Sequence, residues 1–397
     1  MRSRNRSARQ SSANNPNSYS LHDRSNSESN RTYLPSRYIC AEERSSSVKL
    51  THVRIVGTGL IGTSIGLALA KRGISVDVDD ANEKNAKLAR DLIGTNASHA
   101  IPELVIVATP PQSVFAQLKE EFEANPQAIF IDVSSVKTEL IRNVEGLSEL
   151  AKRFVGTHPM AGREIGGAQS AQGDLFEGRA WIITKSSMSD HDAVAMVREF
   201  ITLLGATPYE MDAHSHDALM ARISHLPQVM STALAGVVAG SADLELAGQG
   251  LRDMTRLAAS DAALWSEILF ANKNEVQKIL STLKERLSQI DSAIQSHDKE
   301  SLEKFFSKGR EGRAQLSGKH GAKPRNYALL RIVIEDKPGQ LSRLFIDCAE
   351  VNANIEDLAI EHSPGQFTGL ITLAFSSEDA DRVAKHLMAK SWKVHRE

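Results

Sequence analysis

The sequence predicts an α/β fold built from a doubly wound parallel sheet, an all-α helical domain and a small α+β domain, in that order. Three observations predict it. Strand and helix patterns alternate over residues 48–204, helical periodicity continues alone over 205–316, and a β-α-β-β-α-β pattern occupies 327–397. Residues 317–326 form a predicted linker. At 397 residues the chain is long enough for two or three domains with cores of their own.

The first 47 residues differ from the rest in composition. They are rich in Ser, Asn and Arg and lack hydrophobic periodicity. Such a segment buries too little apolar surface to offset its chain entropy, so we expect residues 1–47 to be a disordered extension. Its Arg-rich, Ser-rich and acid-poor composition also resembles a transit peptide, but it shows no clear amphipathic pattern.

Composition limits the classes of partner and location. The formal net charge of -2 argues against a general nucleic-acid or membrane partner, and no apolar run approaches the roughly 20 residues that span a bilayer. The two cysteines, Cys40 and Cys348, lie far apart, which favours a reducing, cytoplasmic compartment. Since no His or Cys cluster has the spacing of metal ligands, we expect no metal.

A glycine-rich turn follows the first apolar strand. Gly57 permits a tight turn, Gly59 lets the backbone approach a pyrophosphate, and Gly62 lets the next helix, expected over 63–72, pack closely on its strand. The free N–H groups at the start of that helix would point at the phosphates. The candidate cofactor contacts of this turn are Gly57, Thr58, Gly59, Leu60, Ile61 and Gly62. The alternative is an ordinary strand-to-helix turn.

The second apolar strand, 74–78, ends at Asp79 and Asp80. An acidic side chain about 20 residues after the glycines suits the ribose 2′-hydroxyl of NAD and repels the 2′-phosphate of NADP, so NAD is the favoured cofactor. Asp80 is preferred to Asp79 as the ribose contact because Val76 and Val78 alternate inward. Either aspartate could instead lie in solvent at the end of the strand without binding a cofactor. A Rossmann-like domain over 48–204 follows from these features.

Further buried strands are predicted at 104–108, 128–133 and 154–157, with 181–184 closing the sheet. Their carboxyl ends should lie at the edge of the sheet where ligands bind in such folds. Polar or proline-containing segments follow the first three: Thr109-Pro110-Pro111, Ser134-Ser135-Val136-Lys137 and His158-Pro159.

His158 is the candidate proton acceptor. A histidine at the cofactor edge can take a proton from a substrate hydroxyl while hydride leaves the same carbon. The alternative is a histidine that caps the strand end through a backbone hydrogen bond.

The helical region carries further candidates. Apolar residues recur at helical spacing over 276–294, and 233–242 is small and apolar, which suits a buried helix. Such helices often form a dimer contact, although an internal core gives the same pattern. His216 and His225 stand nine residues apart, so on a continuous helix they would not share a face. Either could be a structural histidine.

Two arginines follow. Arg252 and Arg256 stand four residues apart, on one face of a helix, and could bind a substrate carboxylate by bidentate hydrogen bonds. From spacing alone, a solvated or ion-paired couple is the commoner outcome.

Several ordered motifs occur together. They are Gly57-Thr58-Gly59-Leu60-Ile61-Gly62, Val107-Ala108-Thr109-Pro110-Pro111, Asp132-Val133-Ser134-Ser135-Val136-Lys137, His158-Pro159-Met160-Ala161-Gly162, Ser224-His225-Leu226-Pro227, Asp253-Met254-Thr255-Arg256-Leu257-Ala258 and Asn272-Lys273. With them the chain resembles the prephenate dehydrogenase family, with a C-terminal ACT regulatory domain, over nearly everything from residue 53 to the end.

The resemblance implies oxidative decarboxylation of prephenate, or of its amino analogue arogenate, with NAD(P) as hydride acceptor. The product would be 4-hydroxyphenylpyruvate or tyrosine, with carbon dioxide. It further implies that His158 takes the proton of the ring hydroxyl, that Ser135 orients this hydroxyl, and that Arg256 holds a substrate carboxylate. Glu164 matches an acidic residue that guards the entrance to the site. The cofactor contacts would include Thr109 and Pro110, and the helical domain would make a homodimer.

Two positions depart from the family pattern. Ser134 replaces the glycine of Gly-Ser-Val-Lys. Gln228 stands where some members carry a second histidine after His-Leu-Pro, and with His225 it is a candidate substrate-binding residue. A neutral amide in place of a possible cation leaves the choice between prephenate and arogenate open.

The C-terminal ferredoxin-like pattern resembles an ACT domain, in which the segment between the first strand and helix commonly binds an amino acid. We expect feedback control by tyrosine or phenylalanine, the alternative being a module that only dimerises the chain. The candidate effector-binding residues are Asp336, Pro338, Gly339, Leu341, Asn354 and Ile355.

Two other functional hypotheses compete with the one that the family resemblance implies. One is a different NAD-linked hydroxy-acid or imine oxidoreductase, but this hypothesis does not explain why His158, Ser135 and Arg256 occur together. The other is a non-catalytic sensor of nucleotide and amino acid, against which the intact His158 and Arg256 argue.

Overall fold

The structure is a computed structural model, which describes residues 50–95, 100–162, 166–316, 327–335, 337–362 and 368–396. The predicted extension over 1–47 and the predicted linker over 317–326 lie outside these ranges. Within them, no helix is long and apolar enough to cross a membrane.

The N-terminal domain is built on a seven-stranded sheet with strand order β2-β1-β3-β4-β5-β6-β7. Its strands are β1 (His52–Val56), β2 (Ser75–Asp79), β3 (Leu104–Val107), β4 (Ile129–Asp132), β5 (Phe154–Pro159), β6 (Ala180–Lys185) and β7 (Thr207–Glu210). β1 to β5 are parallel, whereas β6 pairs antiparallel with β5 and parallel with β7. The Rossmann-like prediction is confirmed for the parallel part.

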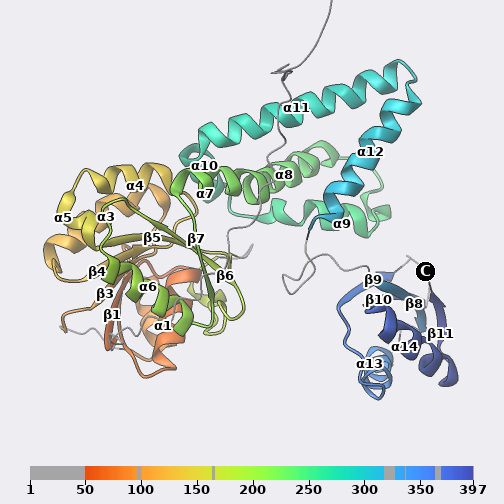
Figure 1. Cartoon of the computed structure of the whole chain (residues 1–397), viewed down its shortest axis with the longest axis horizontal. Coiled ribbons are helices and arrows are strands. Elements are labelled where there is room, and N and C mark those ends of the chain that lie inside the picture. Colours follow the sequence, from red (N-terminus) through yellow and green to blue (C-terminus); the bar gives the residue numbers. More distant parts are fainter. Residues whose placement is uncertain are drawn as a thin grey trace, which may run out of the picture. The chain divides into compact units, whose positions relative to one another are not determined.

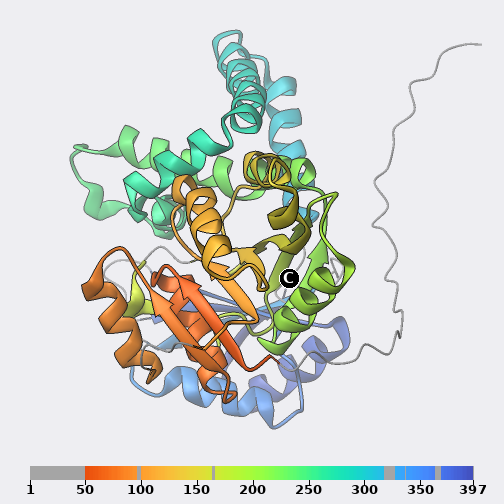
Figure 2. The same cartoon turned by 90° about the vertical axis from the view of Figure 1, so that its left-hand side faces the viewer.

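Helices cover both faces of this sheet (Figures 1 and 2). They are α1 (Leu60–Ala70), α2 (Glu83–Ile93), α3 (Pro111–Ala124), α4 (Thr138–Glu145), α5 (Ser148–Arg153) and α6 (His191–Leu203), with a short 3-10 turn η1 (Ala168–Ser170). On β3, Leu104 and Ile106 join the core beneath α1 and α6, while Val105 and Val107 join the core beneath α3, α4 and α5. A central strand therefore needs apolar residues at every position, which explains its continuous apolar run.

Two predictions about this domain are wrong. The strand at 181–184 does not close the sheet, because β7 pairs beyond it, so the sheet extends past the predicted domain boundary at 204/205. The first helix begins at Leu60 rather than Thr63, because Gly59 already has the extended backbone of an N-cap residue.

The helical part follows β7. It contains α7 (Ala213–Met220), the π-turn η2 (Ala221–His225), α8 (Leu226–Val238), η3 (Leu244–Leu246), α9 (Gln249–Thr255), η4 (Arg256–Ala259), α10 (Ala262–Ala271), α11 (Lys273–Gln295) and α12 (Lys299–Ala314). The expected buried helix over 233–242 is wrong in its end and its burial. α8 stops at Val238, and Val237 is 81% exposed in the single chain.

The C-terminal part is a four-stranded antiparallel sheet with strand order β11-β8-β10-β9. Its elements are β8 (Ala328–Glu335), α13 (Gln340–Ala349), β9 (Asp357–His362), β10 (Thr368–Phe375), α14 (Ser377–Ala389) and β11 (Lys393–Arg396). Buried residues alternate along β8 and join α13 and α14 in one core on one face of the sheet. This confirms the predicted ferredoxin-like β-α-β-β-α-β order.

Candidate active site

The glycine-rich turn between β1 and α1 has no room for side chains at two of its glycines. Gly57 has φ +103°, and a Cβ there would lie 2.5 Å from the carbonyl oxygen of Ala108. A Cβ on Gly62 would lie 2.0 Å from the carbonyl oxygen of Gly57. At Gly59, by contrast, a Cβ would meet no described atom within 4 Å. This space at the N-terminus of α1 fits the backbone approach that a pyrophosphate needs.

Asp80 ties this turn to the end of β2. The amide and hydroxyl of Thr58 donate to Asp80 Oδ2 at 2.8 and 2.9 Å, and the amide of Asn82 donates to Oδ1 at 2.9 Å. Asp79 instead pairs with Arg54 on β1, at 3.1 Å. Since a carboxylate offers about four acceptor sites, Asp80 keeps capacity for a ribose hydroxyl while its position is fixed.

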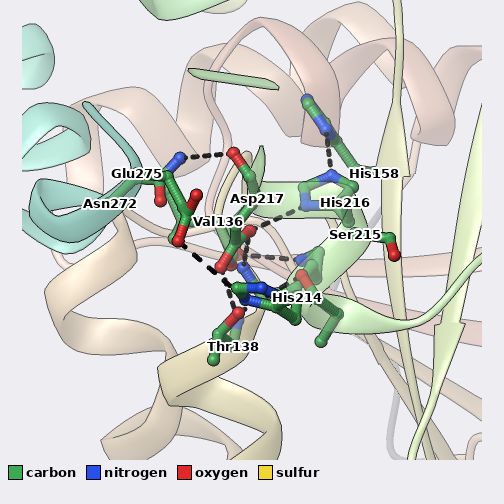
Figure 3. Close-up of polar contacts among 12 residues, drawn as sticks. Val136, Thr138, His158, His214, Ser215, His216, Asp217, Asn272 and Glu275 are labelled. Atoms are coloured by element: carbon green, nitrogen blue, oxygen red, sulfur yellow. Dashed lines mark hydrogen bonds and ion pairs between the residues drawn. The ribbon is translucent and has the colours of Figure 1, made fainter. Parts of the chain in front are cut away.

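His158 lies at the carboxyl end of β5 and is partly exposed. Its Nδ1 lies 2.9 Å from Nε2 of His216 on α7, and the two rings meet edge to face with centroids 5.2 Å apart. Figure 3 shows the second ring nitrogen of His158 on the side of the ring away from His216. That nitrogen is therefore the one that can meet a substrate.

Asp217 follows His216 and joins α7 to the start of α4. Its Oδ1 lies 2.8 Å from His216 Nδ1 and accepts the Lys137 amide at 2.9 Å, while its Oδ2 accepts the Thr138 amide at 2.8 Å (Figure 3). Burial alone would raise the pKa of Asp217, but these hydrogen bonds lower it overall. The carboxylate is thus ionised and only accepts hydrogen bonds.

A buried ion pair lies beneath this contact. Lys137 and Asp132 are both fully buried and paired, and Lys137 Nζ also donates to Ser134 Oγ at 3.0 Å. Burial lowers the pKa of Lys137, and the Asp132 carboxylate acts against that shift. The amide of Thr157, next to His158, donates to Asp132 Oδ1 at 3.2 Å, so the pair also supports the end of β5.

The π-turn η2 brings His225 to the same region. Nine residues make about two and a half turns of a straight α-helix, which would set His216 and His225 on opposite faces. The wider turn shifts His225 away from that position, and both rings are fully buried. His225 Nδ1 lies 3.2 Å from Asn272 Nδ2, and its Nε2 has no hydrogen-bond partner among the described residues.

Burial keeps the histidines neutral, and the nearby Lys137 adds to this effect at His158 and His216. Burial, followed by His216, Lys137 and His225, holds the pKa of His158 well below 6.5. Burial also lowers the pKa of His216, and it lowers the pKa of His225 to about 4. At neutral pH, His158 is therefore an uncharged imidazole that can accept a proton.

Family models match most of this architecture. "Prephenate dehydrogenase, nucleotide-binding domain" matches residues 65–210, and "Prephenate dehydrogenase, dimerization domain" matches residues 212–308. The probable prephenate dehydrogenase NovF of Streptomyces niveus is 30% identical over 356 residues, covering 85% of this chain and 98% of the relative. The chain belongs to the prephenate dehydrogenase family.

Other members are similar over comparable lengths. Prephenate dehydrogenase of Bacillus subtilis is 29% identical over 82% of this chain and 92% of the relative. The structure of Aquifex aeolicus prephenate dehydrogenase with hydroxyphenyl propionate and NAD+ has a TM-score of 0.62 and 26% identity, over 68% of this chain and all of that one. The arogenate dehydrogenase of Synechocystis has a TM-score of 0.57 and 27% identity, over 66% and 99%.

The arginines predicted to share a helix face do not do so. α9 ends at Thr255, and Arg256 opens the 3-10 turn η4. The guanidinium of Arg252 donates to the carbonyl of Ala247 at 3.2 Å. The spacing of Arg252 and Arg256 therefore does not support the binding of one carboxylate by both side chains. Arg256 remains the candidate for binding a substrate carboxylate, as the family resemblance implies.

Gln228 also differs from its expected role. Its side chain is buried, and Nε2 donates to the carbonyl of Leu257 at 2.8 Å. The Nε2 group of this amide thus helps to fix the turn that carries Arg256. Ser135 is partly buried on the turn after β4, whereas Glu164 lies outside the described residues.

Thr109 and Pro110 follow β3 at the start of α3, and Thr109 Oγ1 is buried without a described hydrogen-bond partner. Beside them, a cavity of about 540 Å³ opens between α3, α4 and α10. Its lining includes Ser134 and Val136 but neither His158 nor the glycine-rich turn.

The sequence does not single out Asp132 and Lys137 as parts of the site. His216, next to Asp217 at the start of a helix, is one of its candidates, with a structural histidine as the alternative. Among the described residues, no group of three or more His, Cys, Asp or Glu side chains could hold a metal ion.

The C-terminal part has a cavity of about 360 Å³ at the N-terminus of α13. Of the predicted effector-binding residues, Pro338, Gly339 and Leu341 line it. Asn354 and Ile355 do not: Asn354 donates to Glu356 at 3.0 Å, and Ile355 packs against the domain core. Asp336 lies outside the described residues.

Proposed function

We propose that the chain catalyses the NAD-linked oxidative decarboxylation of prephenate to 4-hydroxyphenylpyruvate and carbon dioxide. The hydroxyl proton leaves to a base and the C4 hydrogen leaves as hydride. The bond to the ring carboxylate then breaks, its electron pair restores aromaticity, and the C4 oxygen takes the proton back from the base. The observation that carries the proposal is His158, a neutral and partly exposed imidazole at the carboxyl edge of the family's nucleotide-binding domain.

The cofactor contacts are proposed from the turn geometry. Gly57, Gly59 and Gly62 would hold the pyrophosphate, and Asp80 would bind the adenosine ribose. NAD supplies the hydride acceptor when it is bound. NADP is disfavoured because its 2′-phosphate would face the Asp80 carboxylate.

The substrate contacts are proposed from the family resemblance. His158 accepts the hydroxyl proton, Ser135 orients that hydroxyl, and Arg256 pairs with a substrate carboxylate. The turn that carries Arg256 is held from α8 by Gln228 and by Ser231, whose Oγ accepts the Ala258 amide at 3.1 Å. Fixing the backbone of this turn limits the positions that the Arg256 side chain must search before it binds.

Arogenate is the second candidate substrate. A solved arogenate dehydrogenase is 27% identical to the chain over 66% of its length. Gln228 is a neutral amide, so it offers no positive charge to the pyruvyl carboxylate of prephenate.

A homodimer through the helical domain is proposed on two grounds. The family model for residues 212–308 describes a dimerization domain. In the single chain this domain also exposes large apolar side chains, including Val237, Leu246, Met254, Phe270, Ile294 and Phe306. Light scattering coupled to gel filtration tests it, since a monomeric mass at micromolar concentration would contradict the proposal.

The C-terminal part is proposed to be an ACT domain that binds tyrosine or phenylalanine. Its support is the cavity at Pro338, Gly339 and Leu341, where α13 begins. The test is inhibition of the full chain and of a chain ending at His320. Inhibition that survives truncation would place the amino acid in the active site instead.

The activity is tested by NADH formation with prephenate, arogenate and a panel of simple hydroxy acids. We expect turnover of at least one cyclohexadienyl substrate and none of the hydroxy acids. His158→Asn should lower kcat by about 10²–10⁴-fold because it removes the general base. The exposed His214 on α7 gives a matched control, and His214→Asn should leave kcat unchanged. A cytoplasmic location is proposed from the composition alone.

A further inference from the structure

We propose that His216, oriented by Asp217, is a positioning residue that fixes His158 in the tautomer whose Nε2 accepts the substrate proton. This inference rests on the proposed function of His158 as the base. It concerns a side chain on α7 that is fully buried and would not itself touch the substrate.

The argument begins at Asp217. Its carboxylate already accepts the backbone amides of Lys137 and Thr138, at 2.9 and 2.8 Å. An ionised carboxylate has no hydrogen to donate, so the contact at 2.8 Å to His216 Nδ1 requires a proton on that nitrogen. The tautomer of His216 is thereby set.

The hydrogen bond between the two histidines then determines the tautomer of His158. A neutral His216 with its proton on Nδ1 has only a lone pair on Nε2, and this nitrogen can only accept. The contact at 2.9 Å to His158 Nδ1 then requires that His158 donate. His158 must carry its proton on Nδ1, which leaves a lone pair on the Nε2 that faces away from His216 (Figure 3).

This order matters for catalysis. With the opposite tautomer, His158 would present an N–H to the substrate hydroxyl and could not take its proton. When the proton arrives on Nε2, the O–H bond breaks and His158 becomes an imidazolium. Its Nδ1–H still donates to His216, whose far side faces the Asp217 carboxylate. The positive charge is therefore stabilised without a second proton transfer.

The other charged groups around His158 do not set its tautomer. Lys137, from the turn after β4, and His225, from η2, lie close enough to lower its pKa but make no described hydrogen bond to its ring, and Asp132 balances the charge of Lys137. Of the described contacts to the His158 ring, only the one from His216 is a hydrogen bond.

The tautomer can be measured directly by ¹⁵N NMR of the histidine-labelled full chain without substrate, with His158→Asn identifying the His158 signals. We expect Nδ1 protonated and Nε2 unprotonated in the wild type, and loss of this preference in His216→Leu. A wild-type His158 protonated on Nε2 would overturn the inference. This readout needs no turnover, so a chain that shows the expected tautomer but oxidises neither prephenate nor arogenate would contradict the proposed function alone.

Kinetics give the second test. His216→Leu should lower kcat by about 10²-fold and leave KM within about threefold, because only a general base is disturbed. His216→Gln keeps an acceptor for His158 Nδ1 and should recover at least about tenfold of that loss, which a purely structural role does not predict. The exposed His214→Gln is the matched control. Equal kcat values for His216→Leu and His216→Gln would overturn the inference.

Discussion

Replacing Lys137 by methionine would remove the charge of a fully buried side chain and keep most of its apolar length. Asp132, also fully buried, would then lack its counter-ion. Breaking a buried ion pair in this way costs about 3–5 kcal/mol. Since Asp132 keeps the Ser134 amide at 2.9 Å and the Thr157 amide at 3.2 Å, we expect a loss near the lower end, about 3 kcal/mol.

The loss is measured by urea unfolding, followed by Trp181 fluorescence. Trp181 is buried in the core of the nucleotide-binding domain, so a chain with Trp265→Phe and Trp392→Phe reports on that domain alone. Lys152→Met is the matched control, because Lys152 pairs with Glu149 at the surface and its loss should be too small to resolve.

Two outcomes decide the reasoning. The double variant Asp132→Asn, Lys137→Met leaves no uncompensated charge and should regain part of the lost stability. A loss for Lys137→Met no larger than that for Lys152→Met would refute the view that this pair holds the site together.

Three further predictions concern activity. The acid limb of kcat/KM should lie well below pH 6.5, because the neutral base is lost only as the pH falls through the lowered pKa of His158. A rate profile from pH 4.5 to 9 measures the position of this limb, and a limb at or above the ordinary value of 6.5 would contradict the prediction. Gly59→Ala should weaken NAD binding without changing folding stability, whereas Gly62→Ala should impair both, because its Cβ would lie 2.0 Å from a backbone oxygen. Calorimetric titration measures NAD binding and thermal unfolding measures stability. If the two variants changed both quantities equally, a ligand at Gly59 would be excluded. Arg256→Ala should raise KM by about 10- to 150-fold with little change in kcat, which is equivalent to a charge-assisted hydrogen bond of about 1.5–3 kcal/mol. Arg252→Ala should have a much smaller effect on KM. Steady-state kinetics of the two variants test the assignment, which is wrong if Arg252→Ala raises KM more.

The glycine-rich turn and the strand ends could be predicted because their signals are local. The spacing of Gly57, Gly59 and Gly62 is a property of ten residues of sequence, and each buried strand is a short apolar run. β7 gave no such signal. It is four residues long, mostly exposed, and contains Pro208, so only its pairing with β6 makes it a strand.

The histidine pair could not be predicted for a different reason. His158 and His216 meet where Asp217 attaches α7 to the amides at the start of α4, a contact between residues about 80 positions apart. The π-turn before His225 likewise depends on tertiary packing rather than on helical periodicity, so a prediction that assumed a continuous helix placed that ring on the wrong face.

The same helical segment connects the two ends of the proposed substrate site. α7 carries His216, the π-turn carries His225, and α8 continues directly from it. From α8, Gln228 and Ser231 hold the turn that begins at Arg256. The group that orients the base and the group proposed to bind the carboxylate are thus linked by side-chain hydrogen bonds to one continuous helical unit. Because Asp217 attaches that unit to the sheet domain at Lys137 and Thr138, a displacement of the unit relative to the sheet would move both groups together.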